Sequence, residues 1–237
     1  MRNFLLLAGA ALIAVAPADA QRRRRSDNSM LEPRGAAGIA LLGFAPQGEF
    51  AENVHSAFGL NGHGLLRLDP QGIVALRADL SYMIYGSERY RAPLGGGPLG
   101  LISVDVNTTN NILLGGLGLQ LMAPGPTVRP YALATAGFNY FFTTSSAEGS
   151  NNSDAFASST NYDDGGFSWT AGGGLYVPLG RTGVNLDLGA RWVDNGKRKY
   201  LRRDGITFAN NQVQLNPVSS QAQGVQFTLG ISYVFRY

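Results

Sequence analysis

Few residues of this chain could carry out covalent chemistry. The sequence has two histidines, His55 and His63, and no cysteine, which excludes disulfides and thiolate sites. His55 precedes Ser56 and follows Glu52, and a serine, a histidine and a carboxylate are the groups that a serine hydrolase combines. Such a grouping is common by chance, and adjacent residues of a strand point to opposite faces. We therefore predict that the chain is not an enzyme and has no catalytic residue.

One acidic stretch raises the question of a metal site. Asp163 and Asp164 are followed by Gly165, as in some calcium-binding loops. The stretch lacks the regular spacing of oxygen ligands that a calcium loop requires. We therefore expect neither a metal nor another cofactor.

Charged residues in the middle of otherwise apolar, alternating segments form a second group. Arg77 and Asp79 lie two positions apart, so in a strand they share a face. Buried charges must be paired, which favours a structural network filling an enclosed interior; a narrow conduction path is the alternative. The predicted barrel-interior polar network consists of His63, Arg67, Arg77, Asp79, Asp187, Arg191 and Arg236.

A basic cluster lies in the long segment 194–224. On a bacterial surface it would face the phosphates of lipopolysaccharide, and the alternative is an ordinary solvated loop. The predicted contact residues are Lys197, Arg198, Lys199, Arg202 and Arg203.

The elements that must position these residues are strands. Residues 225–237 alternate between apolar and mainly polar side chains, which predicts one extended strand with an apolar face. Thirteen residues exceed the usual five or six of a strand in a soluble protein, and fit a tilted strand that crosses a membrane.

Seven further segments resemble this last one, and their connections alternate between long and short. The pattern predicts an all-β fold: an eight-stranded antiparallel up-and-down transmembrane β-barrel, with short periplasmic turns and long extracellular loops. A soluble barrel of lipocalin type, with its apolar side chains inside, has the same period and is the alternative. Expected strands are 35–44, 58–68, 73–85, 111–122, 130–143, 167–177, 184–192 and 225–237; expected long loops are 45–57, 86–110, 144–166 and 194–224.

The first 34 residues differ from the rest. Arg2, the apolar run 4–16 and a small-x-small pattern ending at Ala20 predict a signal peptide over 1–20. Residues 21–34 form a basic arm, expected to be disordered, and 35–237 the barrel domain. From residue 35 onward there are 13 basic and 13 acidic residues, so the net charge of +3 comes from the preceding segment. We therefore expect no nucleic-acid partner.

The ending Tyr233-Val234-Phe235-Arg236-Tyr237, the Pro130-Tyr131 pair and the signal peptide resemble small outer-membrane β-barrels of the OmpA/OmpX type. The resemblance implies a stand-alone monomeric barrel in the bacterial outer membrane, without a peptidoglycan-binding domain. Outer-membrane lipids and lipopolysaccharide would surround it. The barrel-assembly machinery would read an assembly signal formed by Tyr233, Phe235 and Tyr237.

The resemblance also implies a function. It favours a non-enzymatic structural or surface-interaction role through the extracellular loops. A narrow, porin-like channel for small solutes and a lipid-modifying barrel enzyme are the alternatives. In a membrane barrel the aromatic residues should form two interfacial girdles, for which we expect Tyr82, Tyr85, Tyr131, Trp169, Trp192, Tyr233 and Tyr237.

Overall fold

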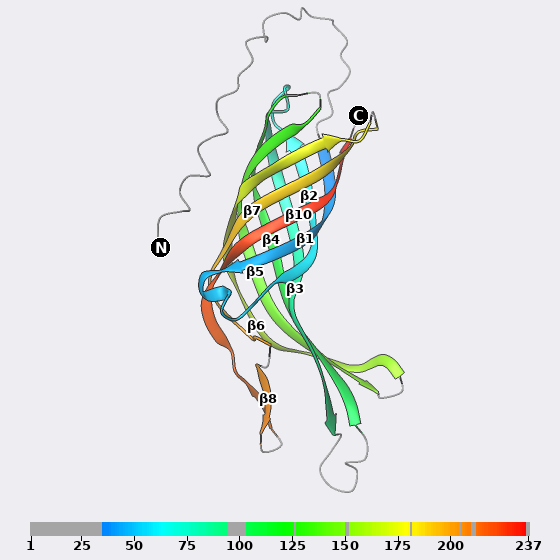
Figure 1. Cartoon of the computed structure of the whole chain (residues 1–237), viewed down its shortest axis with the longest axis vertical. Coiled ribbons are helices and arrows are strands. Elements are labelled where there is room, and N and C mark those ends of the chain that lie inside the picture. The colour runs from blue at the N-terminus through cyan, green and yellow to red at the C-terminus, as the bar shows by residue number, and fades with distance from the viewer. Residues whose placement is uncertain are drawn as a thin grey trace, which may run out of the picture. The chain divides into compact units, whose positions relative to one another are not determined.

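The computed structural model describes residues 35–93, 103–125, 127–149, 152–180, 182–203, 205–209 and 212–235. Eight antiparallel strands form a closed barrel in the order β1-β10-β7-β6-β5-β4-β3-β2 (Figure 1). The described residues contain no helix long and apolar enough to cross a membrane. The barrel strands are β1 (Gly35–Gln47), β2 (Ala57–Arg67), β3 (Val74–Pro93), β4 (Ser103–Met122), β5 (Arg129–Gly149), β6 (Asn152–Pro178), β7 (Val184–Tyr200) and β10 (Val218–Phe235).

The predicted fold class is confirmed, and every strand pairs with both neighbours in the barrel. Because β1 pairs with β10, from Gly35 opposite Phe235 to Gln47 opposite Gln223, the wall has no open edge. Two short elements lie outside the wall: the single 3₁₀ turn η1 (Gly48–Phe50) and a separate hairpin of β8 (Ile206–Ala209) and β9 (Gln212–Leu215).

Six strands extend further at one end than the sequence pattern predicted: β7 runs to Tyr200 and β10 begins at Val218, so both ends of the expected loop over 194–224 are wrong, and β3–β6 extend as well. β3 and β4 stay paired as far as Pro93 and Ser103, and β5 and β6 as far as Gly149 and Asn152. The expected loop over 144–166 is therefore wrong, and so are both ends of the one over 86–110. These segments are rich in Ser, Thr and Asn, and outside a membrane strands need only backbone hydrogen bonds, so no apolar alternation reveals them.

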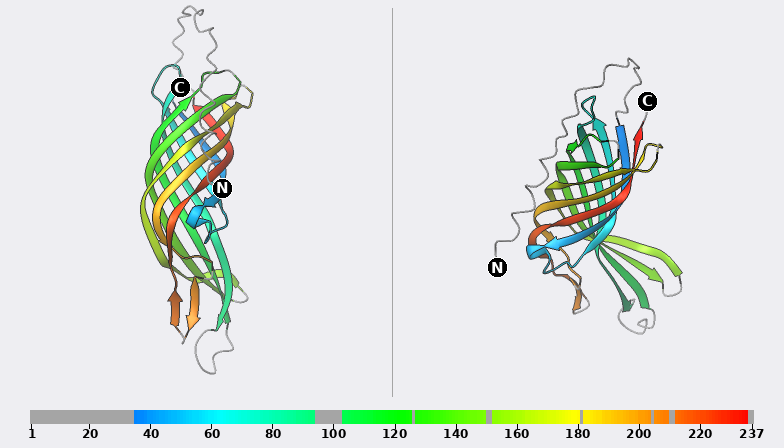
Figure 2. Two further views of the ribbon diagram at one scale, coloured as in Figure 1. Left: turned by 60° about the vertical axis from the view of Figure 1, so that its left-hand side comes forward. Right: turned by 45° about the horizontal axis from the view of Figure 1, so that its top comes forward.

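The two ends of the barrel have different connections. The turns β2–β3, β4–β5 and β6–β7 are short and lie at the end that also holds the last residues of β10; we call this the short-turn end. The extended parts of β3–β6 and the β8–β9 hairpin project from the opposite, long-strand end (Figure 2).

The β2–β3 connection illustrates a tight turn at the short-turn end. The Asp69 carboxylate accepts the backbone N–H groups of Ile73 at 3.0 Å and Val74 at 2.6 Å. These two donors hold the pKa of Asp69 below its usual range. Gly72 has a φ of +66°, which a residue with a Cβ adopts only with strain.

Side chains of the wall have the opposite arrangement to those of a soluble barrel. Leu80 (56% exposed), Leu229 (52%) and Ile231 (52%) point outward, whereas Arg77 (2%) and Gln226 (0%) point into the lumen. A continuous apolar belt around a closed barrel would be unstable in water and is stable in hydrocarbon. The chain is therefore a transmembrane barrel, and the lipocalin-like alternative is wrong.

Aromatic residues agree only in part with the predicted girdles. Tyr82, Trp169 and Tyr233 are exposed on the outer wall. Tyr85 and Tyr131 instead face the lumen, so for them the prediction is wrong. Tyr85 lies two residues from Met83, and Tyr131 lies two residues from Leu133; both neighbours are buried in the lumen. Because side chains alternate along a strand, Tyr85 and Tyr131 face the lumen as well. Tyr237 lies outside the described residues.

Candidate functional site

A charged layer crosses the middle of the lumen. The Arg77 guanidinium donates two hydrogen bonds to the Asp79 carboxylate, from Nε at 2.7 Å and from Nη2 at 2.9 Å. Arg191, on β7, donates to the same carboxylate from Nη1 at 3.0 Å. One buried carboxylate thus joins two guanidinium groups from different strands, the geometry in which buried charges are stable.

Polar residues that were not predicted for the barrel interior complete this layer. Gln120 accepts a hydrogen bond from Arg77 Nη1 through its side-chain carbonyl. Tyr131 donates from its hydroxyl to Asp187 at 2.7 Å, and the Tyr176 hydroxyl lies 3.4 Å from His63 Nε2. Alternation along their strands could have predicted Gln120, Tyr131 and Tyr176 as interior residues, because each lies on the inward face of its strand.

The seven predicted members of the interior network lie in three places. The structure brings five together in the lumen, where His63 Nε2 lies 3.8 Å from the Asp187 carboxylate. Arg67 lies at the short-turn rim, half-buried beside the β2–β3 turn. Arg236 lies outside the described residues. The five residues that meet in the lumen are His63, Arg77, Asp79, Asp187 and Arg191.

An aromatic stopper fills the lumen at the long-strand end. Phe50, from η1, is fully buried there, and its ring centroid lies 5.1 Å from that of Tyr200, 6.1 Å from Phe141 and 6.2 Å from Phe44. The β1–β2 connection therefore folds back into the mouth of the barrel. The buried residues of this layer are Leu42, Phe44, Phe50, Val54, Ala57, Met83, Ile112, Leu114, Phe141, Val193, Tyr200 and Ala222.

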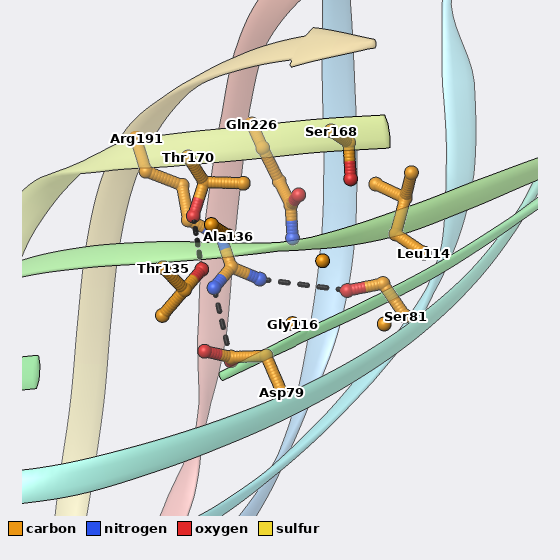
Figure 3. A pocket seen from close by; sticks show the side chains of 12 residues that line it. Asp79, Ser81, Leu114, Gly116, Thr135, Ala136, Ser168, Thr170, Arg191 and Gln226 are labelled. Carbon is orange, nitrogen blue, oxygen red and sulfur yellow. Dashed lines mark hydrogen bonds and ion pairs between the residues drawn. The ribbon is translucent and has the colours of Figure 1, made fainter. Parts of the chain in front are cut away.

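A small polar cavity lies between β3, β4, β5, β6, β7 and β10, beside the charged layer (Figure 3). Arg191 and Asp79 line one side, and the Thr135 and Thr170 hydroxyls, 2.7 Å apart, line another. Gln226 also faces it, and neither polar atom of its side chain has a partner among the described residues. The space open to water centres is ≈ 20 Å³, enough for a water molecule and too little for a metabolite.

Part of the predicted lipopolysaccharide-contact cluster lies on the outer face. Gly196, with a φ of +69°, forms a bulge at which the β7–β10 register shifts. Beyond this bulge Lys197 and Lys199 are exposed on β7, and Arg202 and Arg203 are exposed in the turn that follows. Four of the five predicted cations are thus accessible.

Arg198 has a different role from its neighbours. Its Nη1 donates to the Gly165 carbonyl at 2.7 Å and lies 3.7 Å from the Asp164 carboxylate. The β6–β7 ladder ends at Trp169 opposite Asp194, so these contacts hold the two strands together where backbone pairing has stopped. Arg198 is therefore a structural link between strands.

The remaining sequence candidates are not assembled into a site. Glu52, His55 and Ser56 are exposed in the β1–β2 connection, and no hydrogen bond joins them in the part of the chain that the structure describes. The Asp164 carboxylate accepts the Lys199 backbone N–H at 2.6 Å. Within the described ranges, no group of three or more His, Cys, Asp or Glu residues is placed to hold a metal ion.

Two residues of the predicted assembly signal are described. Tyr233 and Phe235 are exposed on the outer wall, with ring centroids 5.5 Å apart and planes at 77°. The third, Tyr237, lies outside the described residues, and the role of all three stays a prediction.

No family model and no curated protein sequence matches the chain. Among solved structures, the outer membrane protein OprG of Pseudomonas aeruginosa is 13% identical, with a TM-score of 0.47, over 86% of this chain and 98% of its own. Neisserial surface protein A is 13% identical, with a TM-score of 0.45, over 85% of this chain and 97% of its own. Ail, the attachment invasion locus protein of Yersinia pestis, is 11% identical, with a TM-score of 0.42, over 86% of this chain and 100% of its own.

These low identities and TM-scores do not bear on activity. The strand pairing of the chain itself confirms, at the level of fold, the predicted resemblance to small outer-membrane barrels. The function must be argued from the residues of this chain.

Proposed function

We propose that this chain is a non-enzymatic barrel of the bacterial outer membrane, with a surface-interaction role carried by its long-strand end. The observation that supports this proposal best is the filled lumen. The stopper around Phe50 and the layer around Arg77, Asp79 and Arg191 both block the interior. A barrel without a continuous pore interacts with other molecules through its outer surfaces.

The long-strand end supplies such surfaces. β3 and β4 remain paired beyond the bulge between Ile84 and Gly86, and β5 and β6 remain paired beyond Thr143. Hydroxyl and amide side chains bond across these strands, for example Thr109 to Thr144 at 2.9 Å. This polar sheet lies beyond the apolar belt, so it is built to meet water and polar partners.

The exposed cations at the same end support lipopolysaccharide as a partner. Lys197 and Lys199 lie on β7, the strand whose Leu188 faces outward from the apolar belt. Cations just beyond a lipid-facing belt are placed to bind phosphate groups at the membrane surface. Arg202 extends this basic surface into the next turn, together with the exposed Arg203, which also donates to the Ser87 carbonyl at 3.3 Å and lies 4.0 Å from the Glu88 carboxylate.

The test is to replace Lys197, Lys199, Arg202 and Arg203 by Gln and to keep Arg198, because Arg198 links two strands. We expect the variant to fold, shown by its heat-modifiable gel mobility, and to lose most of the lipopolysaccharide that co-purifies with the barrel. A control replaces Glu52 and His55, which are exposed in the β1–β2 connection at the same end, by Gln. Retention of lipopolysaccharide equal to that of the unmodified chain would remove this partner from the proposal.

A further inference from the structure

A second pocket opens at the short-turn end, away from the surfaces discussed above. Its walls combine apolar side chains, including Leu65, Met122 and Val234, with two arginines, Arg67 and Arg129. The space open to water centres is ≈ 60 Å³, against ≈ 20 Å³ for the cavity beside the charged layer, which is room for several water molecules or one small ligand.

The two arginines lie close together around one turn residue. Arg129 Nη2 lies 3.3 Å from the Gly72 carbonyl oxygen, to which it donates. The Arg67 guanidinium carbon lies 3.2 Å from the position that a Cβ on Gly72 would occupy. Two guanidinium groups that line the pocket thus flank a single residue, Gly72.

No carboxylate neutralises this pair within the described ranges. Asp69, the nearest acidic residue in the sequence, directs its carboxylate to the backbone N–H groups of Ile73 and Val74. Neither Arg67 nor Arg129 forms a salt bridge with any described residue. Two adjacent cations without a counter-ion create a local potential that favours an anion.

A polar group deeper in the pocket is also without a partner. Ser232, on β10, is 2% exposed and its hydroxyl has no hydrogen-bond partner among the described residues. It lines the same pocket as the two arginines. A buried hydroxyl without a partner is destabilising, and a bound polar ligand would satisfy it.

We propose that this pocket binds an amphiphilic anion: a carboxylate or phosphate head held by Arg67 and Arg129, with a short apolar group against Leu65, Met122 and Val234. Arginine pairs recognise both head groups through charge-assisted hydrogen bonds. The apolar wall distinguishes such a ligand from a free inorganic anion. This site is independent of the proposed surface role, because it lies at the opposite end of the barrel.

The experiment is a titration of the isotope-labelled full-length barrel in nanodiscs of zwitterionic lipid, followed by NMR. The probes are hexanoate, hexyl phosphate, hexanol and inorganic phosphate. We expect hexanoate, hexyl phosphate or both to shift the side-chain signals of Asn185, Arg67 and Arg129. Binding of hexanol and of inorganic phosphate should each be about tenfold weaker, the loss expected from one charge-assisted contact or a few buried methylenes.

Two sets of variants assign the effect to the arginines. Replacing Arg67 and Arg129 by Gln should weaken hexanoate binding about tenfold or more, and replacing both by Lys should retain most of it. Replacing Arg89, an exposed cation of β3 outside both proposed sites, by Gln is the control and should change nothing. If the Gln variant does not fold, the Lys variant and the four ligands still decide the question.

Each other outcome overturns the proposal. If hexanol bound as tightly as hexanoate and hexyl phosphate, the pocket would recognise only the apolar chain. If inorganic phosphate bound as tightly as they do, it would recognise only the charge. The absence of shifts with both hexanoate and hexyl phosphate would remove the ligand altogether. If the proposal holds, tighter binding of hexanoate identifies the ligand as a carboxylate, and tighter binding of hexyl phosphate identifies it as a phosphate.

Discussion

The lumen is filled by two layers that differ in where their side chains come from. The charged layer is built from Arg77, Asp79 and Arg191, which all project from strands of the wall. The aromatic stopper is centred on Phe50, which comes from a connection between two strands. The first layer is thus part of the barrel itself, whereas the second is an addition to it.

This difference teaches which contacts the barrel needs in order to close. Asp79 compensates two buried guanidinium groups at once, so its loss affects two strands, β3 and β7. Phe50 contacts other aromatic rings, and its loss leaves an apolar cavity at one end.

The largest effect is expected for Asp79→Ala. Removal of the carboxylate leaves Arg77 and Arg191 buried without their counter-ion, which we expect to cost about 3–5 kcal/mol of the free energy of unfolding. Urea unfolding in detergent micelles measures this loss. Glu52→Ala, at an exposed position in the β1–β2 connection, is the control and should leave the midpoint unchanged. A midpoint for Asp79→Ala equal to that of the control would show that the charged layer does not stabilise the barrel.

A smaller effect is expected for Phe50→Ala, about 3 kcal/mol, because the ring is lost from a packed cluster that collapses only in part. Phe58→Ala removes a ring that is 68% exposed on the outer wall and serves as the matched control. In planar bilayers Phe50→Ala should remain silent, because the charged layer still blocks the lumen. Steady single-channel currents from this variant would mean that the stopper alone closes a pore.

The smallest effect is expected at the cavity between the layers. Gln226→Leu removes both unpartnered polar atoms while roughly conserving volume, so we expect the free energy of unfolding to change by less than about 1 kcal/mol. The same urea titration measures it. A loss as large as that of Asp79→Ala would mean that Gln226 belongs to the charged layer.

Much of the wall could be predicted from the sequence, because a bilayer imposes strict alternation on the residues that cross it. The segment from Val225 to Phe235 shows this: Phe227, Leu229 and Ile231 all face outward as expected. Beyond the apolar belt that constraint disappears. The strand pairing of Thr109 and Thr144 therefore left no periodic signal, and both residues were predicted to lie in loops.

The site could be predicted less completely than the wall. Arg77 and Asp79 could be placed on one face because of their spacing along one strand, but which charges form pairs could not be read from the sequence. Gln120 and Tyr176 join them from other strands, and such contacts depend on barrel closure and register. The insertion of Phe50 into the lumen depends on the path of a connection, for which no pattern exists in the sequence.

The central claim, that the apolar face of the strands contacts lipid, is tested most directly by spin labels. The chain has no cysteine, so Leu229→Cys and Leu80→Cys each provide a single labelling site, with Lys197→Cys as the control beyond the apolar belt. In reconstituted bilayers, we expect the labels at 229 and 80 to collide with oxygen dissolved in lipid and not with a water-soluble nickel complex, and the label at 197 to show the reverse. Labels at 229 and 80 that are reached by the nickel complex, or shielded from both reagents, would contradict the transmembrane assignment.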